Sequence, residues 1–227
     1  GTGTDMGFQV LVYNGQKVPQ AQIPITASFA YSMKDLYLSC SDGAGMAFSL
    51  LFDNLSILAK FQRAVVATIA YVHMNNGGTT VVKGQSCIEA GAGSNPNDAC
   101  LEPGMTAGIV GKVWPFQYGV ANGGNPGSAA FEDSRAIAPL GSFDDVVKVK
   151  VGDAGTDTPV GGLGVASQGF RKGDKVLAAI PVAVASRGTL DLNNLGPGAF
   201  VLVELEIVKV KTSSSGGDKK EKKKDKN

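Results

Sequence analysis

The sequence has few of the side chains that enzymes use for nucleophilic or metal chemistry. Among 227 residues there is one histidine, His73, and there are three cysteines, Cys40, Cys87 and Cys100, with no Cys-x-x-Cys pair. A tetrahedral zinc site would have to use all four of these residues together. His73 ends an apolar run, where a structural role is expected, so Ser-His and Cys-His catalysis are disfavoured. We therefore expect no metal and no other cofactor.

The sequence also lacks the long apolar runs of membrane and secreted proteins. No window reaches the ~18 consecutive apolar residues of a membrane span. The first residues lack the basic-then-apolar pattern of a secretory signal. We expect a cytoplasmic protein with reduced thiols and no membrane span.

Charge is low and unevenly distributed. The net charge is +1, and residues 212–227 contain six lysines and three acidic residues, a net of +3. Subtracting +3 from +1 leaves −2 for the body of the chain, so no nucleic-acid partner is expected. The segment 212–227 begins with Ser and Gly and continues with mixed charge, which predicts a disordered Lys-rich tail.

The composition instead favours short strands and turns. Hydrophobic residues make up 43% of the chain, enough for a sizeable core, whereas aromatic residues make up 7%. The 31 glycines are typical of a chain with many turns.

The N-terminal part has strand patterns followed by one helical pattern. The predicted strands are Phe8–Tyr13, Gln22–Phe29, Asp35–Cys40 and Met46–Phe52. A helix is predicted over Asp53–Val72, with Asp53 or Asn54 as its N-cap. Its apolar positions have helical spacing: they are Leu55, Leu58, Phe61, Val65, Ile69 and Val72.

A Gly-, Asn- and Pro-rich connection over Asn75–Gly104 separates this part from the next, interrupted by one short strand pattern at Thr79–Lys83. The second half is mostly strand-like. Its predicted strands are Ile109–Tyr118, Asp145–Val151, Lys175–Ile180 and Phe200–Lys211. Pro115 predicts an edge position or a bulge in the first of these. The one helix candidate lies near Thr158–Gln168.

Two separated blocks of the second half resemble the FK506-binding-protein (FKBP) family of prolyl isomerases. FRKGDKVLAAIPVAVASRG (170–188) resembles the family segment that ends in Ala-Tyr-Gly, and GPGAFVLVELEIVKVK (196–211) resembles its last strand. AAFEDS (129–134) and VVKVKVG (146–152) extend the resemblance upstream, so that it spans about residues 100–211.

The N-terminal part resembles the end of a WASP-homology (EVH1, pleckstrin-like) domain, through QVLVY (9–13) and FSLLFDNLSILAKFQRAV (48–65). The order of the two domains is that of WASP-and-FKBP-like proteins. The resemblance implies an α+β fold: a partial pleckstrin-like sheet with a C-terminal amphipathic helix, then an FKBP-like antiparallel sheet around a short helix. The implied divisions are a partial domain at 1–74, a linker at 75–103, an FKBP-like domain at 104–211 and the tail at 212–227.

Prolyl isomerisation needs no nucleophile, only a dry aromatic bowl and backbone donors that favour the twisted amide. The resemblance places Phe131, followed by Glu132 and Asp133, at the family's Phe-Asp position. It places Val147 at a pocket aromatic of the next strand, and Leu163, preceded by Pro159 and Val160, at the tryptophan of the pocket floor. The tyrosine of Ala-Tyr-Gly falls on Ser186, and the aromatic of the last strand falls on Val203. The early-strand tyrosine falls on either Gly111 or Tyr118.

Four aromatic positions are thus aliphatic or serine, and each lost ring removes about 150–250 Å² of contact area. We expect an FKBP-like domain with a degenerate pocket that acts as a protein-binding or scaffold module in a larger assembly. The alternative is an active FKBP-type isomerase. Expected partners are other proteins, including proline-containing segments. A third option, peptide recognition by the N-terminal part, would use exposed aromatics: Tyr13, Phe29 and Tyr31.

Overall fold

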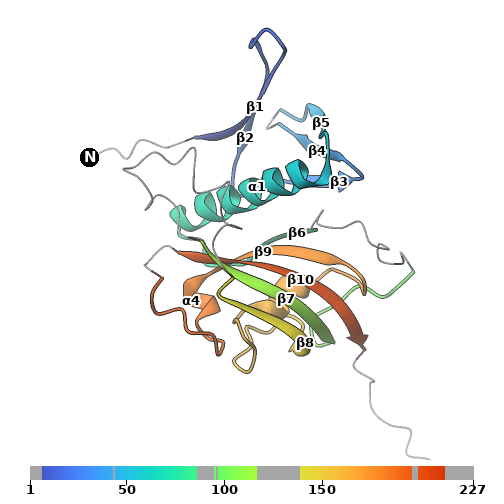
Figure 1. The fold of residues 1–227 in the computed structure, drawn as a ribbon, viewed down its shortest axis with the longest axis vertical. Coiled ribbons are helices and arrows are strands. Elements are labelled where there is room, and N and C mark those ends of the chain that lie inside the picture. Colours follow the sequence, from blue (N-terminus) through green and yellow to red (C-terminus); the bar gives the residue numbers. More distant parts are fainter. Residues whose placement is uncertain are drawn as a thin grey trace, which may run out of the picture.

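The computed structural model describes residues 7–42, 44–85, 95, 97–116, 139–195 and 199–212. Within these residues the fold is mixed α and β, with three antiparallel sheets and few helices. This is compatible with the predicted α+β class. Figure 1 shows the long helix α1 between the small N-terminal strands above and the largest sheet below.

The N-terminal strands form two small sheets. β1 (Phe8–Tyr13) pairs with β2 (Pro19–Ile25), and β3 (Tyr31–Lys34), β4 (Tyr37–Ser41) and β5 (Ala47–Leu51) form the second sheet in that order. The predicted strands correspond to β1, β2, β4 and β5, with ends that differ by a few residues. β3 was not predicted.

Helix α1 (Leu55–Asn75) begins where the sequence predicts it and continues beyond Val72. Of the two predicted N-caps, Asn54 has this role, because its Oδ1 accepts a hydrogen bond of 3.0 Å from the backbone N–H of Ile57. By length and composition alone α1 would be able to cross a membrane, a property that it shares with buried core helices.

The two sides of α1 pack against different strands. One side contributes Leu58, Val65 and Ile69 to a core with β1, β2 and β4. The other side contributes Val66, Ala67 and Ala70 to a core with the largest sheet. The amphipathic helix predicted from the sequence therefore buries two sides, and the side that faces the largest sheet includes the small residues Ala67 and Ala70.

The largest sheet has five strands in the order β6-β9-β10-β7-β8. They are β6 (Val82–Gln85), β9 (Lys175–Pro181), β10 (Phe200–Lys211), β7 (Thr106–Phe116) and β8 (Gly141–Lys150). β6 lies inside the segment predicted as a linker, near the predicted short strand, and pairs with β9. The division of the chain into domains at these boundaries stays a prediction.

β7 lies inside the sheet, although Pro115 predicted an edge or a bulge. The pairing of β7 with β8 ends at Val113, whereas its pairing with β10 continues to Phe116. Pro115 therefore lies in the part of β7 where pairing with β8 has ended, and its missing N–H removes no hydrogen bond between these two strands.

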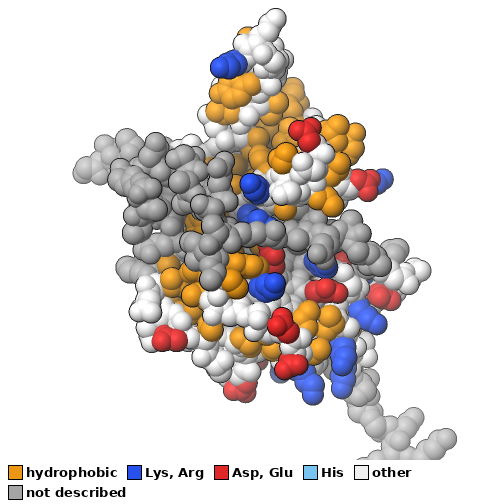
Figure 2. Space-filling view, in the orientation of Figure 1, with side chains coloured by type: hydrophobic (Ala, Val, Ile, Leu, Met, Phe, Trp, Pro, Cys, Tyr) orange, Lys and Arg blue, Asp and Glu red, His pale blue; other side chains and the backbone are white. Residues whose placement is uncertain are grey.

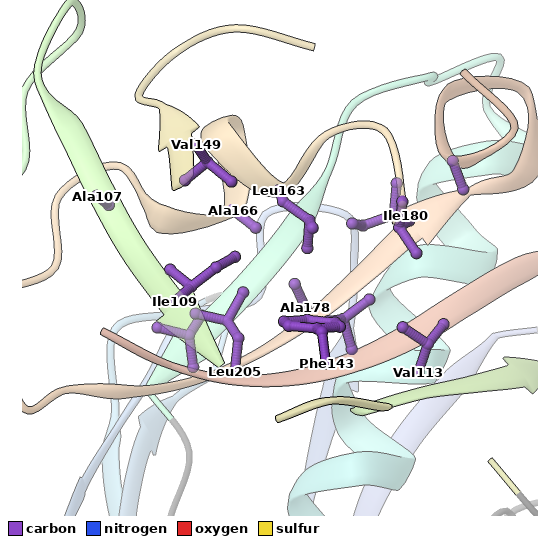
Figure 3. Packing of buried hydrophobic residues seen from close by; sticks show 14 of the residues in the cluster. Ala107, Ile109, Val113, Phe143, Val149, Leu163, Ala166, Ala178, Ile180 and Leu205 are labelled. Atoms are coloured by element: carbon purple, nitrogen blue, oxygen red, sulfur yellow. The ribbon is translucent and has the colours of Figure 1, made fainter. Parts of the chain in front are cut away.

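Two short helices accompany this sheet, α3 (Leu163–Ser167) and α4 (Val182–Ala185). α3 is much shorter than the predicted Thr158–Gln168, and α4 was not predicted. The core between α3 and the sheet consists mainly of aliphatic side chains from every strand but β6 (Figure 3). The tail beyond Thr212 and the turn-rich segment after Phe116 lie outside the described residues.

Candidate functional site

The residues that the resemblance assigns to a pocket floor lie between the five-stranded sheet and α3. Val160 and Leu163 come from the loop and first turn of α3, and Val203 comes from the middle of β10. All three have 0% exposed surface and belong to one hydrophobic cluster. Val147 on β8 is partly buried and packs against the same cluster. The structure thus brings these four residues together as core.

The surroundings of Leu163 are tightly filled. Figure 3 shows Leu163 and Ala166 of α3 pointing toward Ile109, Ala178 and Ile180 of the sheet. Phe143 supplies an aromatic ring to this cluster, and it was not singled out from the sequence. Strand alternation in β8, where Phe143 and Val149 are both buried, is the signal that could have identified it.

Glycines allow α3 to lie close to the chain around it. A Cβ on Gly164 would overlap the carbonyl oxygen of Lys150 and lie 2.7 Å from that of Asp153. A Cβ on Gly161 would overlap the carbonyl oxygen of Val184. The glycines that weaken helix propensity here are therefore required by the close backbone contacts.

Lys83 of β6 caps the C-terminal end of α3. Its Nζ donates hydrogen bonds to the carbonyl oxygens of Val165 (2.8 Å) and Gln168 (2.6 Å) and lies 5.6 Å from the ring centroid of Phe170. Desolvation by burial lowers the pKa of Lys83. The bonded carbonyls and the C-terminal end of the helix dipole favour the ammonium, so burial is the larger effect.

Two of the remaining assigned positions, Ser186 and Gly111, lie in the described part of the chain, and neither is a member of this cluster. Ser186 is exposed just after α4, where its backbone N–H donates to the carbonyl of Val182. Gly111, one alternative for the early-strand tyrosine, faces Phe143, whose Cζ would lie 2.9 Å from an added Cβ. Tyr118, the other alternative, and the assigned Phe131, Glu132 and Asp133 lie outside the described residues.

The opposite face of the sheet is covered by α1 at one end. Phe116 and Phe200 stack there with ring centroids 4.6 Å apart. Nearby, Nε of Arg63 on α1 donates to Oε1 of Glu204 on β10 at 2.9 Å. Arg63 is buried, and its Nη2 has no hydrogen-bond partner within the described part of the chain.

A cavity of about 410 Å³ lies between α1, β6 and the connection from β2 to β3. Phe29 and Tyr31, two of the aromatics considered for peptide recognition, line it, and the third, Tyr13, is exposed on the β1–β2 hairpin. His73 also lines this cavity, and its Nε2 lies 2.6 Å from Oγ1 of Thr80.

In the described ranges, no group of three or more His, Cys, Asp or Glu side chains could hold a metal ion. Cys40 is buried, and desolvation raises the pKa of its thiol. Neither finding identifies a reactive centre.

The comparisons with known proteins find matches among solved structures. No protein-family model and no curated protein matches the chain. Among solved structures, the N-terminal domain of FKBP42 from Arabidopsis thaliana is similar at 17% sequence identity, over 59% of this chain and 87% of that one. The TM-score is 0.36, too low to support a structural argument.

Proposed function

We propose that residues 104–211 form an FKBP-like domain whose prolyl-isomerase pocket is degenerate and which acts as a protein-binding module. The proposed partners are other proteins, including proline-containing segments. The proposed setting is a larger cytoplasmic assembly. The resemblance of the two sequence blocks at 170–188 and 196–211 motivates the family assignment.

One observation carries the proposal that the pocket is degenerate. Leu163 and Val203, which stand where the family has a tryptophan and another aromatic, are completely buried among aliphatic side chains. An isomerase needs an open aromatic bowl that receives a proline ring. When the domain's own side chains fill this volume, the sheet and helix remain stable but no pocket is left for a substrate.

The burial of one sheet face and of one end of the other supports a scaffold role. The α3 side buries the aliphatic cluster, and the other side buries Leu177, Phe200 and Leu202 against α1. A sheet held between α3 and α1 in this way keeps a fixed shape, and it would contact partners through its exposed edges and exposed surfaces.

The test is a protease-coupled proline-isomerisation assay on a short Phe-Pro peptide, with FK506 as inhibitor. Because uncatalysed isomerisation takes tens to hundreds of seconds, acceleration is easily detected. We expect no acceleration above background and no FK506 binding, from protein whose folded state is confirmed by fluorescence of Trp114. An active FKBP serves as the positive control.

A variant sharpens this test. Ser186→Tyr restores the tyrosine of the family segment at an exposed position, which should accept the larger side chain. We expect it to remain inactive, because Leu163 and Val203 still fill the floor. FK506-sensitive acceleration by the unmodified chain would instead establish the alternative, an active isomerase.

A further inference from the structure

Two strands of the sheet carry the same short sequence at the same end. Val147–Lys150 on β8 and Val208–Lys211 on β10 both read VKVK, and β7 lies between them. Successive strand residues point to opposite faces, so each repeat divides its valines and lysines between the two sides of the sheet. Val149 is buried in the α3 core, and Val147 and Val210 pack against it.

The pairing register places the four lysines in two rows. Lys209 lies opposite Gly108, which lies opposite Lys148. In the next row Lys211 lies opposite Thr106, which lies opposite Lys150. We call these four residues the lysine quartet: Lys148, Lys150, Lys209 and Lys211.

A β-bulge in β10 creates this arrangement. The register shifts between Ile207, which pairs with Ile109 in the core, and Lys209, which pairs with Gly108. Without the extra residue, Lys209 would pair with Ala107, a fully buried core position. The bulge therefore places Lys209 and Lys211 on the sheet face opposite α3, beside the lysines of β8.

The quartet is compact and exposed. Strands lie ~4.8 Å apart and alternate residues ~6.8 Å apart, so the four Cα positions mark a rectangle of about 10 by 7 Å. All four side chains are exposed, and none makes an ion pair with another described residue. Figure 2 shows the blue side chains gathered at the lower right, near the ends of β8 and β10.

At the centre of the quartet, the side chain of Val146 lies against Gly108, which has no side chain. A Cβ on Gly108 would lie 2.8 Å from Cγ1 of Val146 and 3.0 Å from Cβ of Lys209. Val146 is 40% exposed on this face. The surface therefore offers one apolar contact, Val146, among four ammonium groups, which suits an extended peptide better than a single small anion.

Acidic residues limit the positive area on both sides. Asp144 is exposed earlier on the same face of β8, and Glu206 of β10 lies 3.9 Å from Lys175 in an ion pair. The described aromatics of this face of β7, Trp114 and Phe116, are buried and offer no stacking surface for bases. The body of the chain has a net charge of −2, which opposes long polyanions.

We infer that the lysine quartet is a docking surface for a short acidic segment of a partner protein, bound extended with carboxylates at alternate positions. Carboxylates two residues apart on an extended chain repeat at ~6.8 Å, the spacing of the lysines along β8 and β10. The methylene groups of these acidic side chains would contact Val146, which is 40% exposed. This surface lies on the opposite side of the sheet from the α3 core, so it does not depend on an isomerase pocket.

The test measures binding of a fluorescent peptide of alternating threonine and glutamate to the full chain, by anisotropy. The quartet variant changes all four lysines to glutamine, and the matched control changes four other exposed lysines: Lys17, Lys34, Lys60 and Lys172. Both keep the Lys-rich tail, so their difference reports the sheet surface alone. We expect about tenfold weaker binding for the quartet variant and less than twofold change for the control.

Three further measurements define the outcome. The threonine–glutamine peptide should not bind, rising salt should weaken binding, and a variant with arginine at all four quartet positions should bind within twofold of the unmodified chain. If the fourfold glutamine variant loses native Trp114 emission, Lys148→Gln with Lys209→Gln replaces it. Equal weakening in the quartet and control variants would overturn the inference. So would tighter binding to single-stranded DNA or to phosphatidylserine vesicles than to the acidic peptide.

Discussion

At the scale of single residues, Lys83 holds the C-terminal end of α3 against β6. Its two hydrogen bonds reach carbonyls at the C-terminal end of the short helix, and its ammonium lies over Phe170. The half-buried ammonium of Lys83 stabilises the fold only while its nitrogen stays within hydrogen-bond distance of these two carbonyls. Lys83 lies in a segment predicted as a linker, so its contact with α3 could not be predicted from the sequence.

Replacing Lys83 by methionine keeps the apolar stem and removes both hydrogen bonds. We expect a loss of about 1–3 kcal/mol in the free energy of unfolding, since two carbonyls each lose a hydrogen bond. Urea titration measures this loss. The control is Lys172→Met at an exposed site, which should lower the free energy of unfolding by less than about 0.5 kcal/mol. Equal stability of both variants would show that Lys83 has no capping role.

The pH dependence of this effect has a definite sign. The pKa of Lys83 is lowered in the folded state, so the unfolded chain binds more protons between that value and the unfolded value of about 10.4. The contribution of Lys83 to the free energy of unfolding therefore rises with pH through that window. It is lost as the pH falls through the folded pKa. The stability of the unmodified chain relative to Lys83→Met should therefore increase toward pH 10.

At the scale of elements, α3 shows how packing decides a short helix. Gly161, Gly162 and Gly164 predict a helix that is short, irregular or absent, and five helical residues are found. Gly162 has φ of +86°, which places a left-handed residue at the start of the helix. Contacts with chain segments far away in sequence determine where glycine is required. Helix propensity, a local property, does not include these contacts.

Gly164→Ala separates propensity from packing. Propensity alone predicts stabilisation by about 1 kcal/mol. We expect net destabilisation of about 1–3 kcal/mol, because the added methyl group meets the carbonyls of Lys150 and Asp153. Gly15→Ala, where nothing lies within 4 Å of the new Cβ, is the control and should change stability little. Chemical denaturation compares them, and a more stable Gly164→Ala protein would contradict the packing argument.

Strands with an alternating pattern, such as β8, and strands with a continuous apolar run, such as β9, could be predicted from sequence. β3 could not, because its four residues depend on a tight turn in which Asp35 has φ of +53°. For the candidate site, the sequence identified Val160, Leu163 and Val203 as positions of interest, and they lie together. It gave no indication that Phe143 packs over Gly111, because that contact depends on the register of β7 and β8.

At the scale of the whole molecule, α1 joins the small N-terminal sheets to the five-stranded sheet. Its two sides complete two hydrophobic cores, and the Arg63–Glu204 ion pair of 2.9 Å ties it to β10. A helix that belongs to both cores cannot leave one without disturbing the other. We therefore expect the described parts to unfold together.

Leu38→Ala tests this coupling. Leu38 is fully buried in the N-terminal core, so the change should cost about 2–5 kcal/mol. Trp114, the single tryptophan, lies in β7 of the other sheet and reports on its unfolding. We expect the urea midpoint measured by Trp114 fluorescence to fall by the same amount as the midpoint measured by far-ultraviolet circular dichroism. Val18→Ala on the exposed hairpin is the control, and an unchanged Trp114 midpoint in Leu38→Ala would show independent units.

The double role of α1 also sets an order of events during synthesis on the ribosome. The N-terminal strands that cover one side of the helix precede it in the chain and are available at once. The other side, with Val66, Ala67 and Ala70, waits for Phe200 and Leu202 of β10, more than a hundred residues later. Until then the nascent chain displays an uncovered apolar helix surface, which is the kind of surface that chaperones bind.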